Sequence, residues 1–154
     1  MNGAAYGAHW APLPLRLALG YGFMYHGAPK LFSAAYHASF VDMLQGIHVP
    51  LPGIAAWVVA VVEFLGGLAL IFGILRFPTT ILLIIDMLVA LFTVHLSHGY
   101  SFINISGMTS SGPTFGMPGF EVNVLYIAGL LCLLLGGYGI FAADSLATRP
   151  PPGG

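Results

Sequence analysis

Residues 54–75 read IAAWVVAVVEFLGGLALIFGIL, a run of 22 residues with a single ionisable side chain, Glu63, near its centre. An α-helix of this length is about 33 Å long, enough to cross the hydrocarbon core of a bilayer, which is about 30 Å thick. A charged group at the centre of such a helix costs about 2.5–3.5 kcal/mol on insertion scales, and is normally kept where it pairs inside the protein or serves a site. The run therefore predicts a membrane span with a polar feature inside the protein.

Three more stretches are apolar enough to span a membrane, at residues 12–32, 78–98 and 120–141. The chain is 58% hydrophobic and 6% charged with a mean hydropathy of +0.91, whereas soluble domains carry about 25% charged residues. We therefore expect an all-α fold, an integral membrane four-helix bundle. It would occupy residues 12–146, with an N-terminal segment at 1–11 and a disordered tail at 147–154.

The connections predict how the spans are arranged. The turn around residues 76–78 is tight, whereas the segments at 33–53 and 99–119 are longer and rich in glycine, serine, proline and aromatic residues. With four spans, both long segments lie on one side and both termini on the other. We expect a short helical piece around residues 39–45, and an ordered or mobile loop at 99–119.

Basic residues near the span ends predict the orientation. Those on the terminal side are Arg16, Arg76 and Arg149, against Lys30 alone on the other side. Cytoplasmic ends of spans carry an excess of Lys and Arg. We therefore expect cytoplasmic termini in the cell inner (plasma) membrane. Arg16 and Lys30 are expected to extend towards opposite membrane interfaces.

Several function classes are excluded by composition and motifs. The net charge of −1 leaves no basic patch for nucleic acid. Cys132 is the single cysteine, so the chain has no intrachain disulfide and no CxxC pair for thiol–quinone exchange. There is no P-loop, no GxGxxG after a strand, no HExxH and no GxSxG. An enzyme that acts alone on a soluble substrate is therefore not expected.

Two carboxylates are predicted near the middle of the membrane. Glu63 lies nine residues into the second span and Asp86 eight residues into the third. They have two interpretations. Each is neutral or paired and fixes the packing of the helices, or each handles protons beside a ligand such as a quinone. Asp86 and His95 are nine residues apart, about 180° around an α-helix, so they are not expected to face one site.

A second set of polar residues is predicted in the half of the bundle opposite the termini. It consists of His26, Lys30, His95, His98 and Glu121. One interpretation is a quinone site whose polar side consists of His26, Lys30, His95 and Glu121. Alternatively, His95 and His98 are three apart on one helix face, and with His26 they could bind haem or copper. The simplest interpretation of these histidines is hydrogen bonding near the membrane interface. His9, His37 and His48 lie outside the spans and are expected to be ordinary surface residues.

Short motifs along the chain resemble one family of small membrane proteins. They are Leu15-Arg16-Leu17, Tyr25-His26-Gly27 and Lys30-Leu31-Phe32 in the first span, then residues 62–70 (VEFLGGLAL), Asp86-Met87 with His95, and Glu121 with Asn123. In order and spacing they are similar to the DoxX family over about residues 13–146. The resemblance implies a four-helix membrane fold of the DoxX and SURF4-like type. The segment at 99–119 departs from the family pattern.

The resemblance also implies function, since DoxX-type proteins are associated with quinol oxidases and thiosulfate:quinone oxidoreduction. Our first hypothesis is therefore a membrane subunit of a respiratory or redox complex, with other membrane or extracytoplasmic subunits as partners. In it the polar set neighbours a quinone, and Glu63 or Asp86 handles protons. The second hypothesis is a structural or assembly subunit without redox chemistry, and the third is a haem- or copper-binding membrane protein.

Overall fold

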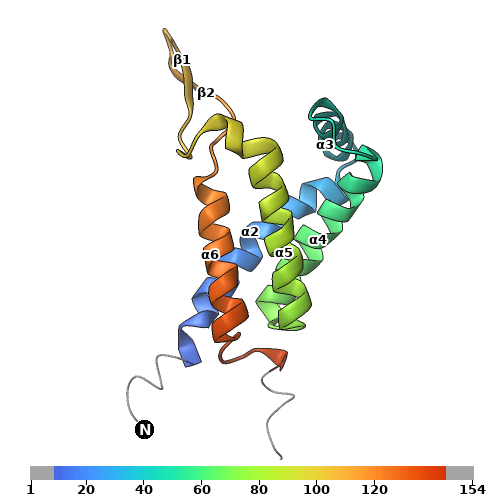
Figure 1. Cartoon of the computed structure of the whole chain (residues 1–154), viewed down its shortest axis with the longest axis vertical. Coiled ribbons are helices and arrows are strands. Elements are labelled where there is room, and N and C mark those ends of the chain that lie inside the picture. The colour runs from blue at the N-terminus through green and yellow to red at the C-terminus, as the bar shows by residue number, and fades with distance from the viewer. Residues whose placement is uncertain (1–8, 145–154) are drawn as a thin grey trace, which may run out of the picture.

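The computed structural model describes residues 9–144, which are mostly helical (Figure 1). The elements are α2 (Pro12–Phe32), α3 (Ala34–Gly46), α4 (Pro52–Phe72), α5 (Arg76–Ala90), a π-helical turn η1 (Leu91–His95), a 3-10 turn η2 (Leu96–His98), strands β1 (Ile105–Thr109) and β2 (Gly112–Phe115), and α6 (Glu121–Gly136).

Four long helices pack around one apolar core. Helix α2 packs most extensively against α4, α4 packs against α5, and α5 lies side by side with α6, which also contacts α2 (Figure 1). The buried residues of the core are Leu19, Phe23, Leu70, Leu83, Leu130, Leu133, Tyr138 and Ala142. Every long helix thus contributes to the same core, and the segment that follows α6 contributes Tyr138 and Ala142.

Glycines allow α2 and α4 to approach closely. A Cβ atom at Gly20 would lie 2.7 Å from the carbonyl oxygen of Gly67, and one at Gly67 would lie 2.6 Å from the carbonyl oxygen of Gly20. Helices in membranes associate through such small residues, since no hydrophobic effect drives them together there. The glycines at this contact therefore fix the spacing of the two helices.

The two ends of the molecule are built from different segments. One end, here called the terminal end, brings together residues 9–11, the α4–α5 turn at 73–75 and residues 137–144. There Ile140 N–H donates to the carbonyl of His9. At the other, the loop end, α3 and the β-hairpin project from opposite sides (Figure 1). The predicted tail at 147–154 lies outside the described residues.

Two helical segments are long and apolar enough to cross a membrane, Pro52–Phe72 and Arg76–His98. Helix α6 is apolar but has only 16 residues, about 24 Å of helix. Helix α2 covers the same residues as the predicted first span, although it is not one of the two segments that combine sufficient length with sufficient apolar character. Large apolar side chains such as Leu65, Phe72 and Leu135 are exposed on the outer faces of the helices, as expected of a surface in contact with lipid.

The structure departs from the sequence prediction in three segments. The fold is not purely α-helical, because β1 and β2 form an antiparallel hairpin where a loop is expected. The short helical piece expected near residues 39–45 is a full helix, α3, capped at Ser33, whose hydroxyl oxygen accepts from Tyr36 N–H. Helix α6 ends at Gly136, because Gly137 has a φ of +89° and the chain turns there.

Candidate functional site

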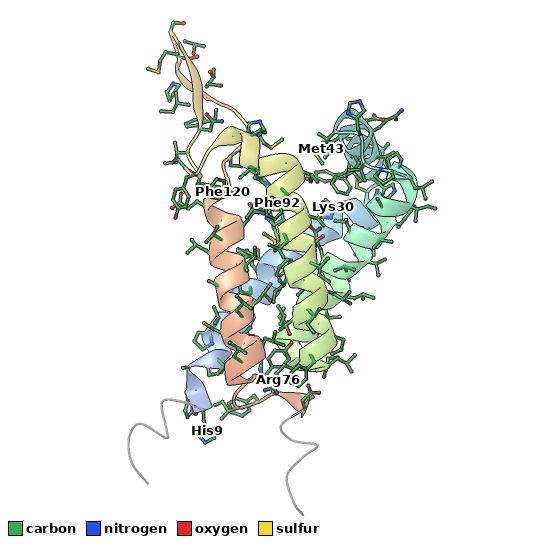
Figure 2. All side chains as sticks on the ribbon, in the orientation of Figure 1. His9, Lys30, Met43, Arg76, Phe92 and Phe120 are labelled. Atoms are coloured by element: carbon green, nitrogen blue, oxygen red, sulfur yellow. The ribbon has the colours of Figure 1, made fainter. Side chains whose placement is uncertain are left out.

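An ion pair joins α2 to α4 inside the protein. The Nζ atom of Lys30 lies 2.6 Å from Oε1 and 2.5 Å from Oε2 of Glu63. The side chains are only 11% and 10% exposed, so solvent screens the pair little. Figure 2 shows Lys30 on the loop-end half of the molecule, far from His9 and Arg76 at the terminal end. This is the one ion pair within residues 9–144.

The local structure explains why Lys30 turns inward. Lys30 lies in the last turn of α2, where the partial negative charge of the helix end favours a cation. Its ammonium also lies 4.6 Å from the ring centroid of Phe40 in α3, within range of a cation–π interaction. The expectation that Lys30 extends towards the membrane interface therefore differs from the structure, in which a carboxylate and an aromatic face surround it.

Asp86 adds a second carboxylate to this pair from a third helix. It interacts electrostatically with Glu63 and with Lys30, and it is half-buried. Within the part of the chain that the structure describes, Asp86 forms no ion pair of its own. We call Lys30, Glu63 and Asp86 the charge cluster. It holds two carboxylates against one ammonium.

The two carboxylates of the charge cluster lie at the mid-length of their helices, whereas Lys30 reaches Glu63 from the last turn of α2. Glu63 is eleven residues from the start of α4 and nine from its end. Asp86 is ten residues from Arg76 and twelve from His98. If these helices cross a bilayer, both carboxylates lie near its midplane, as their positions in the sequence predict.

His26 lies at the edge of the charge cluster. It is one helical turn before Lys30, its ring is exposed beside that of Tyr25 at 5.6 Å between centroids, and it interacts electrostatically with Glu63. His26 thus lies on the outer face of α2, one turn from the ion pair.

Two of the three remaining predicted site residues, His95 and Glu121, hold the base of the hairpin. The Nδ1 atom of His95 lies 2.8 Å from the carbonyl oxygen of Pro118, and Oε2 of Glu121 accepts from Phe102 N–H at 2.9 Å. The His98 ring bonds to the carbonyl of Val94 at 2.8 Å and is exposed. These three side chains thus form hydrogen bonds with the segment after α5, whereas Lys30 and Glu63 form an ion pair with each other.

The π-helical turn η1 changes the direction of the His95 side chain around the helix axis. A π turn contains about one more residue than an α turn, so the residues after it are rotated by about 100° relative to an unbroken α-helix. The angle of about 180° between Asp86 and His95 assumes an α-helix throughout, and the turn at Leu91–His95 breaks that assumption. His95 is directed to Pro118 instead.

The histidines proposed as metal ligands have separate surroundings in the structure. Among the residues that the structure describes, no group of three or more His, Cys, Asp or Glu side chains is arranged to hold a metal ion. The His26 ring lies edge-on to that of Tyr25, whereas His95 bonds to the carbonyl of Pro118 and His98 to that of Val94.

Two further polar groups have structural roles that the sequence analysis did not assign. Arg16 is 1% exposed, and its guanidinium donates to the carbonyls of Tyr138 at 2.9 Å and Phe141 at 3.2 Å. It therefore fastens α2 to the segment after α6 rather than extending to the interface.

Near the loop end, His37 Nδ1 lies 2.9 Å from the carbonyl oxygen of Lys30, and the His37 ring packs on Trp57. No spacing in the sequence signals this contact, because the helix is broken at Ser33 between Lys30 and His37.

Comparison with known proteins gives one result. A family model described as DoxX matches residues 11–96, more than half of the chain. The match includes α2 to α5 with all three members of the charge cluster, and it ends before the hairpin and α6. No curated protein and no solved structure matches the sequence.

Proposed function

The chain belongs to the DoxX family of membrane proteins, and from this premise we propose that it is an integral membrane subunit of a respiratory or redox complex. It neighbours a membrane quinone and aids electron and proton transfer to the quinone pool. In this proposal α2, α4, α5 and α6 are four spans of a bundle in the cell inner membrane, with both termini cytoplasmic. Its partners are other membrane or extracytoplasmic subunits.

The charge cluster is the observation that carries the proposal. Lys30 and Glu63 form an ion pair between α2 and α4, and Asp86 of α5 lies within electrostatic range of both. The two carboxylates lie at the mid-length of apolar segments. Ionisable groups at such depth are costly, and they commonly mark proton or ligand pathways. Two carboxylates beside one ammonium leave one negative charge for a proton to neutralise. This surplus favours proton handling over a purely structural pair.

The residues fit a quinone as a neighbour rather than as a buried cofactor. A quinone supplies a two-electron, two-proton couple dissolved in the membrane. His26 is exposed next to Glu63, so it can exchange a proton between the outer face of α2 and the cluster. Lys30 holds Glu63 in position, and Asp86 stores a proton behind it. His95 and Glu121 then support the hairpin base at the loop end.

The shorter helix α6 is compatible with a span. Its 16 residues are followed by the turn at Gly137 and by residues 138–142, of which Tyr138 and Ala142 are buried in the core. Arg16 holds this continuation against α2. Helix and continuation together are long enough to reach from the hairpin to the terminal end of α2.

The test begins with the complex purified in mild detergent. We expect quinone to co-purify with it, and we expect Glu63→Gln and Asp86→Asn to reduce quinone turnover at least tenfold while subunit content is unchanged. Asp42→Asn, an exposed carboxylate on α3, is the matched control and should be neutral. Absence of bound quinone together with unchanged turnover in both variants would refute the proposal.

A structural or assembly subunit is the second candidate, and one observation favours it. Both carboxylate oxygens of Glu63 already accept from Lys30, so the pair can act as a lock between α2 and α4. In that case His26→Ala and Lys30→Ala lower the amount of assembled complex, but the complex that remains turns over at the normal rate. Under our first proposal the turnover of the assembled complex falls as well.

A further inference from the structure

An open pocket of about 370 Å³ lies at the loop end, between the end of α2, the first turns of α3 and the start of α4. Its lining residues are Leu31, Phe32, Ser33, Ala34, His37, Ala38 and Trp57. The volume is within the range of small-molecule sites, about 300–1,000 Å³. The lining is mostly apolar and includes two aromatic rings, with two polar side chains, Ser33 and His37.

The polar groups of the pocket have defined hydrogen-bonding roles. The carbonyl oxygen of Lys30 can only accept, so the Nδ1 atom of His37 at 2.9 Å carries the proton. In the neutral ring, Nε2 is then an acceptor. The Ser33 oxygen accepts from Tyr36 N–H, so its hydroxyl proton remains available to donate. The pocket thus offers one acceptor and one donor, which match a hydroxyl group.

The aromatic groups indicate the kind of head that carries this hydroxyl. The rings of His37 and Trp57 pack at 4.2 Å between centroids, and Phe32 packs against Phe64. Trp57 is in the second turn of α4 and is half exposed, a position typical of the membrane–water interface. A flat ring that partitions into the bilayer fits between such side chains. We propose that this pocket binds the hydroxylated aromatic head of a membrane-soluble hydroquinone, with Nε2 of His37 as its hydrogen-bond acceptor.

The pocket adjoins the backbone of Lys30, one member of the charge cluster. Its wall begins at Leu31, the residue after Lys30, and His37 bonds to the backbone of Lys30 itself. The inference rests on the proposed function and specifies it, because it assigns the reduced form of the quinone to a particular site. An oxidised quinone has carbonyl oxygens that only accept, and it gains nothing from His37 Nε2. The pocket therefore prefers the hydroquinone.

Calorimetric titration of the full chain in mild detergent tests this, with a short-chain alkyl hydroquinone and its oxidised quinone as probes. Asparagine can place an amide N–H at the position of Nδ1 but has no atom at Nε2, whereas glutamine can place an acceptor near Nε2. We expect His37→Asn to weaken hydroquinone binding about fivefold to tenfold, as loss of one hydrogen bond implies. His37→Gln should bind more tightly than His37→Asn, and quinone binding should be unchanged in both.

A second variant keeps the test decisive if substitutions at His37 disturb α3. Ala38→Phe fills the pocket and leaves His37 unsubstituted. It should abolish binding of both probes, while thermal unfolding shows that the fold is intact. Equal hydroquinone affinity of wild type and His37→Asn, unchanged binding by Ala38→Phe, or no binding to wild type would each overturn the pocket assignment. If Glu63→Gln still lowers quinone turnover of the complex in that case, the proposed function stands without this site.

Discussion

Gly27 of α2 lies directly against Glu63 of α4. A Cβ atom at position 27 would be 2.9 Å from the Cβ of Glu63 and 2.6 Å from the backbone nitrogen of Phe64. The absence of a side chain at Gly27 lets the two helices approach closely at the level of the charge cluster. One turn further along α2, Lys30 reaches the Glu63 carboxylate.

The first prediction concerns this close approach. We expect Gly27→Ala to destabilise the protein by about 1–3 kcal/mol, because the added methyl group meets backbone atoms that cannot move without separating the helices. The free energy of unfolding in detergent measures the effect. Gly53→Ala is the matched control, since a Cβ there has nothing within 4 Å. It should be neutral or slightly stabilising within a helix. Equal stability of the two variants would contradict the packing role of Gly27.

The second prediction concerns the charges of the pair. We expect Lys30→Met to cost about 3–5 kcal/mol, because it leaves the Glu63 carboxylate buried without a cation. The double variant Lys30→Met/Glu63→Gln should recover most of this loss, because no unpaired charge remains. A double-mutant cycle on the free energies of unfolding isolates the coupling between the two side chains. Additive losses would show that the pair is not coupled.

The third prediction concerns Arg16 at the terminal end. Substitution by methionine removes the donors to the carbonyls of Tyr138 and Phe141, and we expect a loss of about 2–3 kcal/mol. The Nε atom of Arg16 is buried without a partner within the described residues, which limits the loss. The segment at 137–144 should become sensitive to limited proteolysis before the helices unfold. Asp42→Asn serves as the control, and an unchanged cleavage rate in Arg16→Met would refute this role.

The sequence predicted the helices well where apolar length decides them. The bounds of α2 agree with the predicted first stretch, and α4 starts two residues before the second, because Pro52 is a favourable first-turn residue. The family resemblance is confirmed over residues 11–96. These features follow from composition and from short-range patterns, which a single sequence displays directly.

The contacts between helices were harder to predict. Lys30 was expected to extend outward, since nothing in α2 alone reveals that Glu63 lies opposite it. His37 was expected to be a surface residue, because its partners belong to the end of α2 and to Trp57. Such pairs depend on how α2 and α4 pack. That packing depends in turn on glycines whose facing neighbours the sequence does not specify.

The segment at 99–119 was the least predictable. It contains no charged residue and many glycine and serine residues, so it lacks the alternation that marks a half-buried strand. The observed hairpin is stabilised by its own ladder and by side-chain bonds at its base, including that of Asn104 Nδ2 to the carbonyl of Met117 at 2.8 Å. Bonds of this kind form no recognisable sequence motif.

The fourth prediction concerns the base of this hairpin. The π-helical turn directs His95 Nδ1 to the carbonyl oxygen of Pro118, next to Gly119, whose N–H donates to Ser101. In His95→Leu this anchor is lost, and we expect amide hydrogen exchange at residues 116–120 to accelerate about threefold to tenfold, which corresponds to loss of one hydrogen bond. His95→Asn can place a donor near Nδ1 and should retain most of the protection. Because the hairpin lies outside the helical core, the thermal unfolding of both variants should match wild type. Unchanged exchange in His95→Leu would show that the bonds of Gly119 and Phe120 alone hold the base.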